Sequence, residues 1–288
     1  MLSSAFFTMG KTHNVCQDYA LAGVIQSSNR RYAVLSDGCS SVAHTDVGAR
    51  LAVLNAVQQF RDNLSNHSTI AYYSLYQAKA YLKSIVPILS TECLTATLLV
   101  AEELADGNVR ATVYGDGFIL ARNRTGPIDI FQMDFQNYPF YPLYLLSNIS
   151  AQAYFQYGPK IKSVTKTTLD PISMQIINKE VTTTEYTYEK YISEFGMQQG
   201  NVIALWSDIF SKDQYDLIML ASDGIDSFFT TDGVHVPPET VIPHLINIKT
   251  FAGEFMLRRG RAVTRDVCEA KGWIYHDDVS LAAIYLGG

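Results

Sequence analysis

The chain has 288 residues, 48% of them hydrophobic, so it can bury a sizeable core as one large α/β or α+β domain. With 22 Lys and Arg against 28 Asp and Glu, its formal charge is −6, which argues against binding of nucleic acid or of an anionic membrane. No basic segment precedes the short N-terminal apolar patch, and no run approaches the roughly 18 apolar residues of a membrane helix, so we expect a soluble, cytoplasmic protein.

Short apolar and β-branched runs bounded by turn residues predict strands along the chain. In order, they cover 31–36, 95–101, 109–114, 117–122, 216–221 and 279–286. Tight turns at ADGN and YGDG join neighbouring strands, which therefore pair antiparallel. Apolar residues at helical spacing predict helices over 46–61, 70–86 and 251–271, the last ending at Gly272. Helices separated from antiparallel strands indicate an α+β layered fold.

Residues 124–205 differ from the rest, being rich in Tyr, Gln, Asn and Thr. We interpret them as an insertion lying against the main body of a single domain that covers 1–288. Within it, ISMQII and VTTTEYTYE flank NKE at 178–180, which predicts a hairpin that turns there. The aromatic cluster YPFYPLY at 138–144 is interpreted as packing rather than as a binding platform.

Acidic residues stand at the ends of several predicted strands. Asp37 and Asp223 each follow an apolar strand and precede Gly, Asp116 lies between two strands, Asp277 precedes the last strand, and Asp18 lies near the start. Charged groups beside an apolar core are costly unless they are paired or bind metal, and basic residues are scarce nearby. Carboxylates without a thiol or histidine pattern suit Mg²⁺ or Mn²⁺. Each Asp-Gly can equally be a simple turn, so convergence of the carboxylates remains a hypothesis here.

The order of these motifs resembles the metal-dependent serine/threonine protein phosphatases of type 2C, most of all a bacterial branch, over about residues 10–286. The motifs are, in order, Gln17-Asp18, AVLSDG, TATLLV, YGDGF, LASDGIDSF and DDVSLAAIYL. The resemblance implies a four-layer α-β-β-α sandwich of two antiparallel sheets flanked by helix pairs. It also implies hydrolysis of phosphoserine or phosphothreonine in proteins by a water activated between two Mn²⁺ or Mg²⁺ ions, with a third ion as in bacterial members.

The resemblance assigns roles to individual residues. The implied metal ligands are Asp18, Asp37, Gly38, Asp116, Asp223 and Asp277. Asp37 would bridge two ions and, with Asp223, carry the catalysis. Where many members place an arginine that holds the phosphate, this chain has His13, which we assign to phosphate contact against the alternative of a surface loop residue. A histidine that some members carry after the first Asp-Gly is Cys39 here, so His44 is considered as the acid for the leaving group.

Two other functions stay open at this point. One is a non-catalytic regulatory or docking module on the same fold, suggested by the missing arginine and histidine. The other is a hydrolase of small phosphate monoesters, because residues 124–205 do not reveal a substrate. The complete set of acidic residues favours a catalyst acting on a phosphorylated protein, and we expect a monomer.

Overall fold

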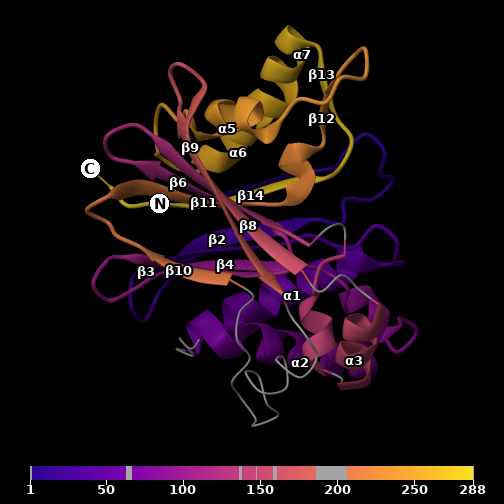
Figure 1. Cartoon of the computed structure of the whole chain (residues 1–288). Helices are drawn as coiled ribbons and strands as arrows, with labels where there is room; N and C mark the ends of the chain where they lie inside the picture. Colours follow the sequence, from indigo (N-terminus) through magenta and orange to yellow (C-terminus); the bar gives the residue numbers. More distant parts are fainter. Residues whose placement is uncertain are drawn as a thin grey trace.

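The computed structural model describes residues 2–62, 67–135, 138–146, 148–157, 161–185 and 206–287. Two antiparallel sheets lie face to face, with helices outside each of them (Figure 1). This arrangement confirms the predicted α+β fold of four layers. Buried aliphatic side chains from both sheets fill the space between them, among them Leu35, Leu99 and Ile218.

One sheet has seven strands in the part of the chain that the structure describes. In spatial order they are β1 (Ser3–Thr8), β14 (Val279–Tyr285), β11 (Tyr215–Ala221), β6 (Gly117–Asn123), β7 (Ile128–Asp134), β8 (Ile161–Asp170) and β9 (Gln175–Glu185). Ala221, the last residue of β11, pairs with Phe118 at the start of β6 and with Leu281 near the start of β14. This register places the turns before β6 and β14 at the same end of the sheet as the turn after β11.

The other sheet has five strands among the described residues. Their order is β10 (Trp206–Phe210), β5 (Val109–Tyr114), β4 (Leu98–Glu103), β3 (Arg30–Ser36) and β2 (Tyr19–Ile25). Residues 98–102 of β4 are all buried, because one face of the sheet meets the other sheet and the opposite face is covered by helices. Strands covered on both faces have continuous apolar runs rather than alternation, as the sequence shows here.

Helices cover the outer face of each sheet (Figure 1). Next to the five-stranded sheet lie α1 (Thr45–Arg61) and α2 (His67–Ile85), with α3 (Asn148–Tyr157) beyond them. Over the seven-stranded sheet lie α5 (Pro238–Ile246), α6 (Phe255–Arg261) and α7 (Cys268–Lys271). The remaining short elements are η1 (Thr91–Leu94), η2 (Pro142–Leu146), η3 (Asp223–Asp226), the π-helical turn η4 (Ala262–Val267), β12 (Phe228–Thr230) and β13 (Trp273–Tyr275). None of the helices described is both long and apolar enough to cross a membrane.

Two of the predicted elements begin later in the structure than in the sequence prediction. The strand predicted over 95–101 starts only at Leu98, because residues 96–97 bond to the Asp37-Gly38 turn instead. The helix predicted over 251–271 starts at Phe255, although it ends at Gly272 as predicted, with φ 63° at that glycine.

The predicted hairpin turn at 178–180 is wrong. These residues lie inside β9, and the turn that joins β8 to β9 is at 171–174. The predicted strand end at 186–189 lies outside the described residues. Strands β7, β8 and β9 extend the seven-stranded sheet from within the stretch 124–205, whose identity as an insertion stays a prediction.

Candidate active site

Asp37 lies where β3 leaves the five-stranded sheet. Its backbone N–H donates to Thr97 Oγ1 at 3.0 Å, and the backbone N–H of Thr97 donates to the Asp37 carbonyl at 2.8 Å. Gly38 forms a single bridge to Ala96. The residues ahead of β4 therefore hold the Asp37-Gly38 turn in place.

Asp223 and Asp277 come together because the end of β11 packs against the start of β14. The Ser222 hydroxyl accepts the N–H of Ser280 at 3.0 Å, which joins the two segments. Gly224 allows the close approach, since a Cβ at this position would lie only 1.7 Å from the Asp278 carbonyl oxygen. The turn after β11 thus places Asp223 next to the residue pair that precedes β14.

Asp116 lies in the tight turn between β5 and β6. The glycines on either side, Gly115 and Gly117, have φ of 98° and 126°, a conformation that residues with a Cβ rarely adopt. The sequence YGDGF therefore encodes a turn that points one carboxylate into the end of the sandwich.

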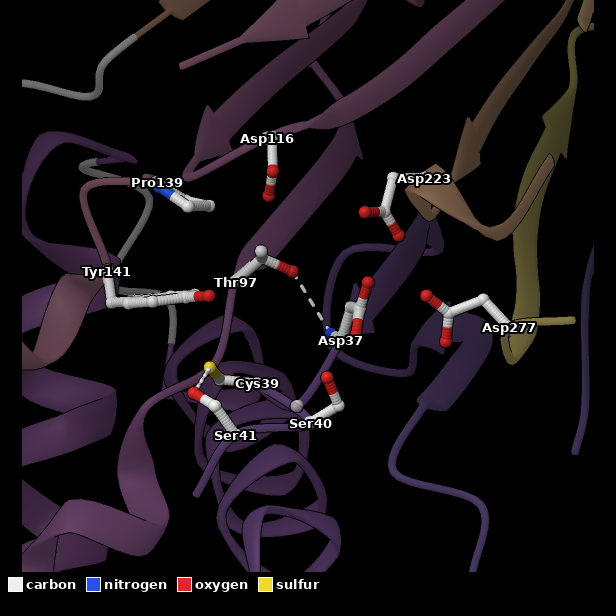
Figure 2. A pocket seen from close by; sticks show the side chains of 11 residues that line it. Asp37, Cys39, Ser40, Ser41, Thr97, Asp116, Pro139, Tyr141, Asp223 and Asp277 are labelled. Carbon is white, nitrogen blue, oxygen red and sulfur yellow. Dashed lines mark hydrogen bonds between the residues drawn. The ribbon is translucent and has the colours of Figure 1, made fainter. Parts of the chain in front are cut away.

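These side chains face a common cavity of about 270 Å³ (Figure 2). Its lining is Asp37, Gly38, Cys39, Ser40, Ser41, Thr97, Asp116, Pro139, Tyr141, Asp223 and Asp277. Figure 2 shows the carboxylates of Asp37, Asp223 and Asp277 turned toward one another, with Asp116 pointing in from the opposite wall. Among the described residues, the lining contains no Lys or Arg. The structure thus brings together five of the six residues predicted as metal ligands.

The sixth residue, Asp18, lies behind the cavity rather than on its wall. Its side chain is 1% exposed, and neither carboxylate oxygen has a hydrogen-bond partner among the described residues. Burial raises the pKa of Asp18 to about 7, with neighbouring Asp278 adding to the rise. The side chains of Asp37, Ser280 and Ser222 lie beside this carboxylate and offset part of the rise. A buried carboxylate is costly to ionise, so a cation bound nearby would favour its charged form.

Burial and mutual repulsion both raise the pKa values of the cavity carboxylates. Burial, together with the charges of Asp18 and Asp223, raises the pKa of Asp37 well above its usual range. Burial and Asp223 likewise raise the pKa of Asp116 to about 8, and the pKa of Asp277 rises for the same reasons. Because the described lining offers no Lys or Arg, a bound cation would favour the state in which these carboxylates are charged together.

The donor set fits a hard divalent cation. All the side-chain ligands would be carboxylate oxygens, which Mg²⁺ and Mn²⁺ prefer, and Asp18 has unsatisfied oxygens directly behind them. Among the residues described, no three His, Cys, Asp or Glu side chains form a compact ligand group as they stand. The carboxylates thus line the cavity at a distance from one another, which agrees with the repulsion between their charges.

His13 does not line this cavity. Its Nε2 lies 3.3 Å from Asp277 and its Nδ1 lies 3.0 Å from Asp278. Asp278 is itself buried and accepts the backbone N–H of Gly10 at 2.7 Å and that of Gln17 at 2.5 Å. The N-terminal loop is thereby fixed to the segment that carries Asp277. The other candidate, His44, precedes α1 on an exposed loop and does not line the cavity either.

Sequence reasoning missed Tyr141 and Pro139 in the lining. Their cluster was assigned to packing, which is true of Phe140, packed with Tyr154 and Phe155. The hydroxyl of Tyr141 instead points into the cavity (Figure 2). The sequence holds no signal for this contact, because it depends on how the segment after β7 returns across the mouth of the site.

Comparisons with known proteins agree with this geometry. A family model described as Protein phosphatase 2C matches residues 10–247. A bacterial serine phosphatase structure is 16% identical with TM-score 0.56, covering 100% of this chain and 98% of its own. The serine/threonine phosphatase Stp1 from Staphylococcus aureus is also 16% identical with TM-score 0.56, covering 100% and 96%. That of S. agalactiae is 13% identical with TM-score 0.51, covering 99% of both chains. At such identities the likeness shows the fold, and no curated protein matches the sequence.

Proposed function

The chain belongs to the protein phosphatase 2C family, and we propose that it hydrolyses phosphoserine and phosphothreonine in proteins with divalent cations held by its cavity carboxylates. Membership of this family makes the chain a protein serine/threonine phosphatase. The dependence on Mn²⁺ or Mg²⁺, the individual ligands and the residues it acts on are the proposed part.

One observation carries the proposal. Carboxylates from four separate segments of the chain line one cavity, to which the described part of the chain contributes no Lys or Arg. Charge repulsion opposes entry of a negatively charged phosphate into such a cavity unless bound cations neutralise the carboxylates. The same cations would also relieve the repulsion that raises the pKa of Asp37 and of Asp116.

The proposed ligands follow from the positions of the side chains. Asp37, Asp223 and Asp277 would hold the ions on one side, with the Gly38 carbonyl beside them, and Asp116 would hold a further ion on the opposite wall. When bound, the ions would lower the pKa of a water molecule and offset the negative charge of the phosphoryl oxygens.

Other side chains would position the ligands and contact the phosphate. Thr97 fixes Asp37 through the backbone hydrogen bonds described above. His13 would orient Asp277, and its contacts support this positioning role more than direct contact with the phosphate. Ser40 and Tyr141 present neutral hydroxyl groups to the cavity, where they can donate to phosphoryl oxygens.

The test is release of phosphate from phosphoserine and phosphothreonine peptides by the purified protein. We expect turnover with Mn²⁺, none after EDTA treatment, and none in Asp37→Asn, which keeps the shape of the side chain but removes its charge. Turnover that persists in EDTA would overturn the metal dependence. A phosphotyrosine peptide serves as the specificity control.

The docking-module alternative makes the opposite prediction for the same experiment. It requires an intact fold with no turnover of any phosphopeptide in Mn²⁺. The presence of every acidic residue in or behind the cavity favours catalysis, since a module that only docks has no need for buried, mutually repelling carboxylates.

A further inference from the structure

A second hollow lies beside the carboxylate cavity. It has a volume of about 390 Å³ and is lined by residues of the loop 12–17 and of the segment 40–46, which leads into the first turn of α1. Ser40 and Ser41 line both hollows, so the second is a groove that continues directly from the first. In Figure 2 these two serines lie below Asp37. The N-terminal loop forms the opposite wall through His13, which also contacts Asp277.

The groove differs chemically from the cavity. Its side chains include small aliphatic ones, Val15, Val42 and Ala43, and Val15 is 52% exposed although it is apolar. The acidic residue in its lining, Asp46, is paired with Arg50 at 3.3 Å one helical turn away. Among the described residues the lining holds no Lys or Arg, and its two histidines are His13, which contacts Asp277 and Asp278, and His44, which is exposed.

The loop backbone adds hydrogen-bonding capacity. The backbone N–H groups of Ser40, Ser41 and Ala43 donate to no backbone or side-chain acceptor within the described part of the chain. Unpaired main-chain groups next to small apolar side chains suit an extended peptide, whose own backbone supplies the missing partners. The volume also lies in the range of sites that bind ligands specifically.

We propose that this groove binds the peptide segment on one side of the phosphorylated residue, and that it favours segments with small, uncharged side chains. The proposal rests on the function proposed above, since it deepens the substrate class of the same site. A protein substrate would then bind to both the cavity and the groove, whereas a small phosphate monoester would occupy the cavity alone.

The test compares two substrates in Mn²⁺: p-nitrophenyl phosphate, which fills only the cavity, and a phosphoserine peptide with alanine and serine flanks. Two variants fill the groove without touching the carboxylates, Ala43→Trp and Val15→Trp. The matched control is Leu54→Trp, which adds the same side chain elsewhere. Leu54 lies in α1, is 49% exposed and does not line the groove.

We expect both groove variants to lower kcat/KM for the peptide by about tenfold or more, chiefly through KM, with p-nitrophenyl phosphate within about twofold. The control should match the unaltered protein on both substrates. Unchanged peptide hydrolysis in both variants would overturn the proposal. So would an equal loss on both substrates, because the residues would then act on the centre or on the fold.

Failure of the underlying function gives a different result, namely no turnover of either substrate by the unaltered protein. Binding of peptide to the groove is then measured by fluorescence polarisation of the labelled phosphoserine peptide with Mn²⁺ present. Binding that is lost in Ala43→Trp and kept in Leu54→Trp supports the groove. Equal binding by all three proteins overturns it.

Discussion

Gly224→Ala is expected to disable the centre without touching a carboxylate. A Cβ on residue 224 would lie 1.7 Å from the Asp278 carbonyl oxygen, whereas such contacts essentially never fall below 3.0 Å. The turn after β11 and the start of β14 must therefore separate by about 1.3 Å or more. That movement parts Asp223 from Asp277, which these two segments carry.

The size of the effect follows from that displacement. A misplacement of about 1 Å at a catalytic centre can lower the rate by about 10²-fold, and overpacking a core costs about 1–3 kcal/mol. We expect kcat/KM for p-nitrophenyl phosphate in Mn²⁺ to fall by about that factor, with a modest loss of stability in urea denaturation.

Gly233→Ala is the control for destabilisation alone. Gly233 has φ of 84° with nothing within 4 Å of its would-be Cβ, so alanine there strains the backbone by about 1–2 kcal/mol without moving the site. Its kcat/KM should stay near that of the unaltered protein. Our reasoning is refuted if Gly224→Ala keeps full kcat/KM, or if both variants lose activity equally.

Three further changes probe other parts of the site. In EDTA the protein should lose stability as pH rises from about 4 to about 8, because folding raises the pKa of Asp18 to about 7 and stability is lost as pH passes a raised folded-state pKa. Asp18→Asn should flatten that profile of melting temperature against pH while lowering Mn²⁺-dependent turnover. Tyr141→Phe, which removes only a hydroxyl that faces the cavity, should raise KM about fivefold or more with Mn²⁺ binding unchanged, whereas Tyr144→Phe, outside the lining, should not. Thr97→Val leaves the N–H of Asp37 without its acceptor and should cost about 1–3 kcal/mol in urea denaturation, together with part of kcat.

Each of these expectations has a contrary result. A melting temperature that rises with pH in EDTA would contradict the expectation that ionised Asp18 destabilises the folded protein. Equal effects of the two tyrosine variants would reduce Tyr141 to a packing residue. Full stability in Thr97→Val would show that water or another group serves the N–H of Asp37.

Local patterns were sufficient to predict the central strands and helices. The runs ending at Ser36 and Ala221 are continuous and apolar, and in the structure both faces of these strands are covered. The helix over residues 45–61 was predicted to within one residue, because its apolar positions repeat at helical spacing. The convergence of Asp37 with Asp223 was predicted from the order of motifs rather than from periodicity. A local sequence pattern does not show how two separate sheets pack against each other.

The prediction failed where tertiary contacts decide the local structure. Residues 96–97 have strand character but are drawn out of β4 by Asp37 and Gly38. Residues 178–180 carry the polar composition of a turn, yet they lie within β9, an outer strand of the sheet among the described residues, where they are exposed to solvent. Tyr141 enters the site through a loop whose path depends on packing of the neighbouring aromatic residues.

The most direct test of the metal centre is a calorimetric titration of the metal-free protein with Mn²⁺, repeated on Asp37→Asn. We predict saturable binding of more than one ion by the unaltered protein, with affinity lost or greatly weakened in the variant. Absence of saturable binding by the unaltered protein, or equal binding by both proteins, would contradict the conclusion that these carboxylates form a metal centre.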